Sequence, residues 1–179
     1  MMRVHNLQSL ISNSQTAMSS DDLIQQQAKI LFEQAYRHQR KGELGDAIEL
    51  YKRSIAMFAT AEAYTFLGWS YSMMRRYDDA IEMCHKAIEL DPDYGNPYND
   101  IGAYLLEQEK YAEAIPWLEK AIVAPRYEAR QYPHTNLGRA YEKLGEHRRA
   151  LRCYNEALRL DPLYLPAEWA KTALLGKLN

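Results

Sequence analysis

The chain has 179 residues, of which 47% are hydrophobic and 26% are charged, and its formal net charge is −2. A chain of this length forms one domain or one short array, with enough apolar residues for a sizeable core. Broad electrostatic binding to nucleic acid or to an anionic membrane needs a basic excess, so we expect neither as a partner.

Residues 1–20 are rich in Ser, Asn and Gln, which predicts a mobile N-terminal tail. This stretch has no apolar run of signal-peptide length and no cysteine that could carry a lipid. The two cysteines, Cys84 and Cys153, lie in apolar helical runs, which favours reduced, packed thiols over a disulfide. These features predict a cytoplasmic protein.

An internal repeat begins in residues 21–60, where the segment GDAIELYKRS contains Ala47. The same apolar pattern recurs around Ala80, Ala114 and Ala150, at intervals of 33, 34 and 36 residues. A period of this length indicates a repeat architecture, in which each unit buries its apolar face against its neighbours. The first unit is the least regular, as terminal units often are.

Residues 61–94 show the unit most clearly. Apolar and small residues at i, i+3, i+4 and i+7 predict a first helix over residues 64–71. A second apolar face begins at Ala80 and ends before Pro92, because proline cannot donate a backbone hydrogen bond. Small residues such as Gly68 mark places where two helix backbones approach closely. The unit is therefore predicted to be two antiparallel helices joined by a short turn.

Residues 95–130 and 131–164 repeat the pattern with one irregularity. The third interval is longer, at the segment APRYEARQYP, so the helix before it should end near Ala124 and leave an extended surface loop. This loop is either a tolerated insertion or a side contact. Residues 165–179 contain the segment AEWAKTALLGKL, which predicts one amphipathic helix that caps the exposed end of the last unit.

The recurring residues resemble the tetratricopeptide repeat (TPR) family, whose first helix carries a Leu-Gly pair followed by Tyr. In this chain the pair is held by Leu67-Gly68, Ile101-Gly102 and Leu137-Gly138. The resemblance implies an all-α fold, a right-handed α-solenoid of about four helix-turn-helix units plus a C-terminal capping helix. It assigns an atypical first unit to residues 21–60 and regular units to residues 61–94, 95–130 and 131–164.

The resemblance also implies a binding surface. In this family the first helices of successive units line a concave face, and repeat positions 5 and 9 lie along a peptide-binding groove. Carried over to this chain, these positions are Phe32, Tyr36, Thr65, Trp69, Asn99, Ala103, Thr135 and Arg139. Tyr36 and Trp69 both fall at position 9, so we expect them to be neighbours across the groove. The alternative is that Trp69 packs, buried, against the next unit.

Catalytic and metal-binding patterns are weak in this sequence. The five histidines are scattered, and a pair such as His85 and Glu89 at i, i+4 is common on a helix surface. Asp78 and Asp79 lie at the start of a predicted helix, where carboxylates interact favourably with the helix dipole. We expect no enzyme activity, no metal and no cofactor.

The predicted function is a non-enzymatic scaffold or adaptor that binds a peptide segment of a partner protein in its concave groove and mediates complex assembly. A second hypothesis is a self-associating structural module. We expect a monomer or a weak homodimer. The dimer contact would be made either by the aromatic residues of the groove, Phe32, Tyr36 and Trp69, or by Trp169, Leu174, Leu175 and Leu178. A narrower form of the first hypothesis is an assembly factor like the pilotins of type IV pili, which are TPR proteins with an extended loop between units.

Overall fold

A computed structural model describes residues 19–178 of the chain, and these residues form nine α-helices and no strand. The predicted all-α class is therefore confirmed for this part of the chain. The helices are α1 (Ser20–Lys41), α2 (Leu44–Met57), α3 (Ala61–Met73), α4 (Tyr77–Leu90), α5 (Asn96–Glu107), α6 (Tyr111–Val123), α7 (Gln131–Lys143), α8 (His147–Leu160) and α9 (Leu165–Leu178).

The residue at which α1 begins is determined by side-chain hydrogen bonds at its N-terminus. The Ser19 hydroxyl accepts a hydrogen bond from the Asp22 backbone N–H at 3.0 Å, and the Asp22 carboxylate accepts one from the Ser19 N–H at 3.0 Å. This reciprocal capping box satisfies two donors that would otherwise lack partners, so α1 begins at Ser20. The rest of the predicted tail, residues 1–18, lies outside the described residues.

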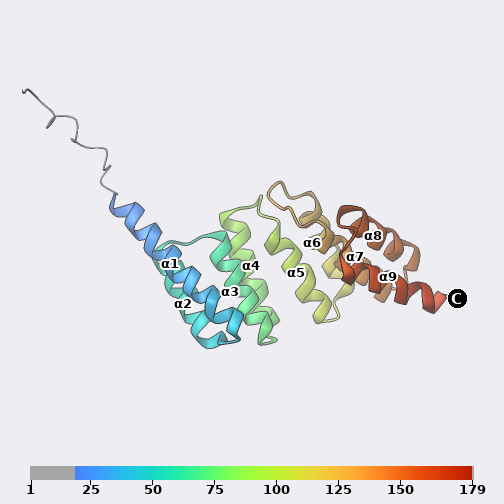
Figure 1. Cartoon of the computed structure of the whole chain (residues 1–179), viewed down its shortest axis with the longest axis horizontal. Coiled ribbons are helices and arrows are strands. Elements are labelled where there is room, and N and C mark those ends of the chain that lie inside the picture. The colour runs from blue at the N-terminus through green and yellow to red at the C-terminus, as the bar shows by residue number, and fades with distance from the viewer. Residues whose placement is uncertain (1–18, 179) are drawn as a thin grey trace, which may run out of the picture.

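The helices pack as successive hairpins, α1 with α2, α3 with α4, α5 with α6 and α7 with α8, and α9 packs on α7 and α8 (Figure 1). Each hairpin turn contains one residue in the left-handed region. These residues are Gly42, Arg75, Glu109 and Gly145, with φ of 80°, 59°, 60° and 78°. They recur at the spacing of the sequence repeat, so the predicted α-solenoid of helix pairs with a final single helix is confirmed.

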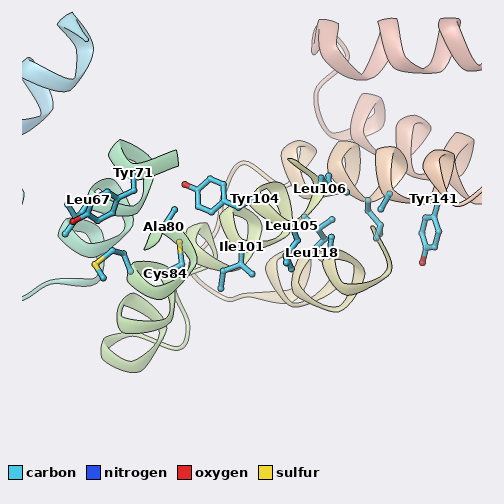
Figure 2. Packing of buried hydrophobic residues seen from close by; sticks show 14 of the residues in the cluster. Leu67, Tyr71, Ala80, Cys84, Ile101, Tyr104, Leu105, Leu106, Leu118 and Tyr141 are labelled. Carbon is cyan, nitrogen blue, oxygen red and sulfur yellow. The ribbon is translucent and has the colours of Figure 1, made fainter. Parts of the chain in front are cut away.

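The core is one continuous layer that passes from each hairpin to the next. The alanines that mark the repeat, Ala47, Ala80, Ala114 and Ala150, are all fully buried. Figure 2 shows side chains of α3 and α4 adjoining those of α5 and α6 within this layer. The Leu-Gly pairs are explained by close approach, because a Cβ added at Gly138 would lie 2.4 Å from Cε1 of the Tyr154 ring.

The array is curved toward the side of the odd-numbered helices. Each of α1, α3, α5 and α7 touches the next odd-numbered helix, whereas no even-numbered helix in residues 19–178 approaches the next even-numbered one. Closer spacing on one side of a stack bends the stack toward that side. We therefore call the surface formed by α1, α3, α5 and α7 the inner face.

The extended loop between α6 and α7 packs against the connection between α4 and α5. Helix α6 ends at Val123, as predicted. The Arg126 N–H donates to the Asp93 carbonyl at 3.0 Å, and the Gly95 N–H donates to the Arg126 carbonyl at 3.2 Å. The buried Tyr127 ring fills the space over Gly95. The loop is therefore tied down by side contacts within the chain.

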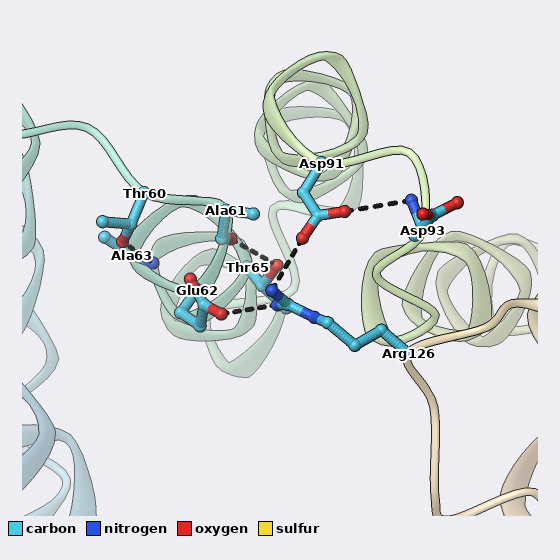
Figure 3. Close-up of polar contacts among 8 residues, drawn as sticks. All are labelled: Thr60, Ala61, Glu62, Ala63, Thr65, Asp91, Asp93 and Arg126. Atoms are coloured by element: carbon cyan, nitrogen blue, oxygen red, sulfur yellow. Dashed lines mark hydrogen bonds and ion pairs between the residues drawn. The ribbon is translucent and has the colours of Figure 1, made fainter.

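The Arg126 side chain extends these contacts to α3. Its guanidinium lies between two carboxylates, with Nη2 2.6 Å from Glu62 Oε1 and Nη1 2.8 Å from Asp91 Oδ2 (Figure 3). It also lies 4.6 Å from the centre of the Tyr94 ring. One loop residue thus contacts the first turn of α3 and the residue that follows α4, which are the two ends of one hairpin.

Among the helices of residues 19–178, none is both long enough and apolar enough to cross a membrane.

Candidate interaction surface on the inner face

The predicted groove residues divide by repeat position. At position 9 the side chains face outward: Tyr36 is 36% exposed, Trp69 is 43% exposed, Arg139 is exposed and Ala103 is half-buried. At position 5 they face inward: Phe32 is half-buried and the other three are buried, namely Thr65, Asn99 and Thr135. The stripe is therefore not a uniform row of accessible side chains.

The buried position 5 residues make hydrogen bonds within the chain. The Thr65 hydroxyl donates to the Ala61 carbonyl and the Thr135 hydroxyl donates to the Gln131 carbonyl, both at 2.8 Å. The Asn99 side chain accepts from the Asn136 amide at 3.1 Å, across the contact between α5 and α7. Neighbouring first helices lie so close that a position 5 side chain is enclosed between them. These three side chains are therefore buried and hydrogen-bonded within the chain.

Three rings form an aromatic row on α1 and α3, which we define as Tyr36, Phe66 and Trp69. The Phe66 ring lies between the other two, with its centre 5.5 Å from Tyr36 and 5.8 Å from Trp69, both edge to face. The expected pairing of Tyr36 with Trp69 is thus made through Phe66. The exposure of Trp69 also rules out the alternative that this ring is buried against the next unit.

A hollow of about 370 Å³ adjoins the aromatic row between α3 and α5. It is lined by Thr65, Phe66, Trp69, Ser72, Asn96, Asp100, Ala103 and Tyr104. Only Asp100 in this lining carries a formal charge. Burial raises the pKa of the Asp100 carboxyl to about 7, against the opposing effect of a hydrogen bond from the Asn99 amide at 3.3 Å. The hollow therefore combines aromatic walls with one carboxylate.

Phe66 and Asp100 are the functional candidates that the sequence analysis missed. Both fall at position 6 of their repeats, which was assigned neither to the core nor to the groove stripe. The sequence does contain a signal for them. Consecutive first helices carry an aromatic ring and a carboxylate at the same repeat position. Because an α-helix advances 100° per residue, position 6 lies next to positions 2 and 9 on the same face.

Between α5, α7 and α9, charged side chains of the chain pair with one another. Arg139 Nη2 lies 3.0 Å from Glu107 Oε1, and Lys177 Nζ lies 2.8 Å from Glu142 Oε1. The Tyr154 hydroxyl donates to Glu142 at 2.9 Å. Arg139, a predicted groove residue, is therefore already bound to a carboxylate of the chain.

The described residues also hold one group of three potential metal ligands, His38, Glu43 and Asp46, in the turn between α1 and α2. His38 Nδ1 lies 2.6 Å from Glu43 Oε2 and 3.9 Å from Asp46 Oδ2. Both carboxylates are exposed to water, and the short hydrogen bond accounts for the arrangement without an ion.

The proposed self-association face needs one correction. Trp169, Leu175 and Leu178 of α9 are 66%, 41% and 49% exposed, but Leu174 is fully buried. Leu174 belongs to the main core, because α9 packs on α7 and α8 through this side chain. The exposed part of the face is therefore smaller than the sequence predicted.

Two models of the tetratricopeptide repeat match the chain, one at residues 61–94 and 132–164 and the other at residues 98–123. Anaphase-promoting complex subunit 6 of Arabidopsis thaliana is 26% identical over 138 residues, which cover 75% of this chain and 25% of the plant protein. Sperm-associated antigen 1 of Rattus norvegicus is 30% identical over 83 residues, which cover 46% of this chain and 9% of the rat protein. The chain thus spans a quarter or less of the length of these relatives.

Solved structures show the same fold. PilF of Pseudomonas aeruginosa superposes with a TM-score of 0.79 at 21% identity, covering 89% of this chain and 71% of PilF. MamA from Desulfovibrio magneticus RS-1 superposes with a TM-score of 0.71 at 22% identity, covering 90% of this chain and 87% of MamA. The repeat models span more than half of the sequence, and the helix pairs stack as the repeat requires; the chain belongs to the tetratricopeptide repeat family.

Proposed function

We propose that the chain is a non-enzymatic adaptor that binds a segment of a partner protein along its inner face, over the aromatic row and the adjoining hollow. The observation that carries this proposal is the exposure of Tyr36 and Trp69 beside the half-buried Phe66. Apolar ring surface left in water is unfavourable, and covering it with a partner recovers roughly 25 cal/mol for each Å² buried. Aromatic residues at the centre of a concave surface are also frequent hot spots of binding.

Family membership supports the general part of this proposal. The repeat residues of this chain serve helix packing, and the relatives include a protein named as a subunit of the anaphase-promoting complex. The structure titled as PilW, a type IV pilus biogenesis factor, superposes with a TM-score of 0.74 at 22% identity. That likeness concerns the fold, and a pilotin-like role is a narrower form of the same proposal.

The proposal is tested with a library of random twelve-residue peptides displayed on phage and selected on the full-length protein. The most enriched peptide is synthesised, and its affinity is measured by isothermal titration calorimetry. We expect Trp69→Ala to weaken binding about 30-fold, which corresponds to about 2 kcal/mol for a hot-spot aromatic. The melting temperature should move by less than about 3 °C, because an exposed ring contributes little to packing.

Trp169→Ala is the matched control, since Trp169 is more exposed than Trp69 and lies on α9, away from the aromatic row. This variant should bind the peptide as the wild type does. If Trp69→Ala leaves the affinity unchanged, or if both variants lose it equally, the aromatic row is not the binding surface.

Self-association is the second candidate function, and the exposed side chains of α9 favour it. Trp169 is 66% exposed and Leu165 is 55% exposed. Sedimentation equilibrium of the wild type and of Trp169→Ala tests this candidate. A concentration-dependent dimer that Trp169→Ala abolishes would support it, and a monomer in both samples would exclude it.

A further inference from the structure

The Asp100 carboxylate lacks a compensating charge. Within residues 19–178 it forms no ion pair, and the one hydrogen bond to its side chain comes from the neutral Asn99 amide. Buried carboxylates are normally paired or strongly hydrogen-bonded, because an isolated charge in a poorly hydrated site is unfavourable. The raised pKa of this carboxyl, at about 7, has the same origin in burial.

The titratable groups around Asp100 do not supply a cation. Burial raises the pKa of the Cys84 thiol on α4 and of the Tyr104 hydroxyl on its own helix, so both are neutral near pH 7. The same holds for Tyr94 and Tyr127 of the two adjoining loops, where burial is again the largest cause. Each of these groups carries an electrostatic influence of Asp100.

The guanidinium of Arg126, in the loop between α6 and α7, is already paired with other carboxylates. Arg126 is bound by both Glu62 and Asp91 (Figure 3). No ion pair joins this guanidinium to Asp100. When ionised, Asp100 therefore keeps a negative charge that no side chain of residues 19–178 neutralises.

The walls of the hollow suit a long cationic side chain. Phe66, Trp69 and Tyr104 provide ring surface, and a volume of about 370 Å³ accommodates the aliphatic stem of lysine or arginine. A cation placed against an aromatic face is attracted by the quadrupole of the ring, most strongly for tryptophan. Its stem covers apolar surface while its charged end reaches the carboxylate.

We propose that the hollow between α3 and α5 receives a lysine or arginine side chain of the partner segment, with its charge on Asp100 and its stem against Trp69. This inference rests on the proposed function, because it names the chemistry of the segment that binds the inner face. The argument is charge complementarity: the carboxylate in the site lacks a cation, and the exposed ring beside it is the surface that cations prefer. An apolar side chain would cover the rings but leave the half-buried carboxylate without a compensating charge.

The test uses the most enriched peptide that contains no histidine. Synthetic versions of this peptide are also made, and in each of them one basic residue is neutralised. Arginine is replaced by citrulline and lysine by norleucine, which remove the charge and keep the length. We expect one such replacement to weaken binding to the wild-type protein at least 10-fold. The same replacement should change binding to Asp100→Asn less than 2-fold, because the variant no longer offers a charge to pair with.

Two further measurements separate this pairing from a general effect of charge. Glu113→Gln removes the same charge from an exposed position on α6, outside the inner face, and should bind like the wild type. Affinity for the unmodified peptide should rise from pH 6 to pH 8 as Asp100 ionises, and this rise should be absent in Asp100→Asn. The neutralised peptides report on the wild-type protein itself, so the test holds even if Asp100→Asn folds poorly.

The outcomes distinguish the two proposals. If Trp69→Ala weakens binding but no neutralised peptide does, the pairing with Asp100 is wrong and the adaptor proposal stands. An enriched peptide without lysine or arginine has the same meaning. If Trp69→Ala has no effect on binding, both proposals fail.

Discussion

Two stretches of the inner face differ in whether their charged side chains have partners. Between α5, α7 and α9, ion pairs join Arg139 to Glu107 and Lys177 to Glu142. Between α3 and α5, Asp100 has no cation among the described residues, and exposed rings lie beside it. The same helix hairpins build both stretches. The repeat therefore fixes where the helices lie, and the individual side chains decide which part of the surface is left to bind something else.

Two carboxylates make the same comparison in terms of pKa. Burial raises the pKa of Asp100 to about 7, since only a neutral amide opposes it. Burial acts in the same direction on Glu142, but hydrogen bonds from Lys177 and Tyr154 outweigh it and hold the pKa of this carboxyl below its usual value. The presence of a cation thus decides the sign of the shift. The paired stretch is internally satisfied, and the open stretch is the better candidate for recognition.

The largest effect is expected from Gly138→Ala, in the paired stretch. The added methyl group would meet the Tyr154 ring at 2.4 Å, and this ring is fully buried and tethered to Glu142. We expect a loss of about 1–3 kcal/mol in the free energy of unfolding, measured by urea denaturation. Gly45→Ala is the control, because nothing lies within 4 Å of an added Cβ there. Equal losses in the two variants would contradict this account of the Leu-Gly pair.

Asp100→Asn, in the open stretch, should raise the free energy of unfolding rather than lower it. The pKa of about 7 in the folded state lies above the ordinary value of 3.8, so the folded state binds more protons and loses stability as pH rises between these values. Because Asp100 keeps contact with water, we expect the variant to be more stable than the wild type by about 1–2 kcal/mol at pH 8. The difference should shrink as the pH falls and vanish only below 3.8, where the carboxyl is protonated in both states. A thermal melt series from pH 5 to pH 8 measures it, and a constant difference would refute the assignment.

Glu109→Gly compares the turns of the middle hairpins, which have a non-glycine residue in the left-handed region, with those of the terminal hairpins, which have glycine there. Glu109 has φ of 60°, whereas the equivalent turn of the last hairpin uses Gly145. Glycine adopts this region without a steric penalty, so the substitution should stabilise the protein by about 0.5–1 kcal/mol in chemical denaturation. The converse change, Gly145→Glu, should destabilise it by a similar amount. A loss of stability in Glu109→Gly would show that the Glu109 side chain makes a contact that outweighs the strain.

The smallest effect is expected from Glu107→Gln, the counterpart of Asp100→Asn in the paired stretch. It removes the ion pair with Arg139, whose two side chains are 49% and 47% exposed. Exposed pairs of this kind contribute about 0.2–1 kcal/mol and are screened by salt. The loss should therefore be measurable in dilute buffer and should disappear in 1 M salt. A stabilising effect at pH 8 would remove the contrast between the two stretches.

The sequence alone determined the helix pairs, their spacing and the end of α6. These features depend on contacts that recur in every unit, such as the buried Ala80 and the close approach at Gly138, so a periodic pattern records them. The same information was enough to recognise the family and to place Tyr36 and Trp69 on the inner face.

Only the tertiary structure decided which side chains of that face are accessible. Thr65 is enclosed between neighbouring first helices, Leu174 turns into the core, and Phe66 lies between the two rings that were expected to meet. Arg139 is neutralised by Glu107 while Asp100 finds no cation among the described residues. These outcomes depend on the particular side chains that neighbouring units bring together. A repeat pattern describes each unit by its shared positions, so it carries no record of these pairings.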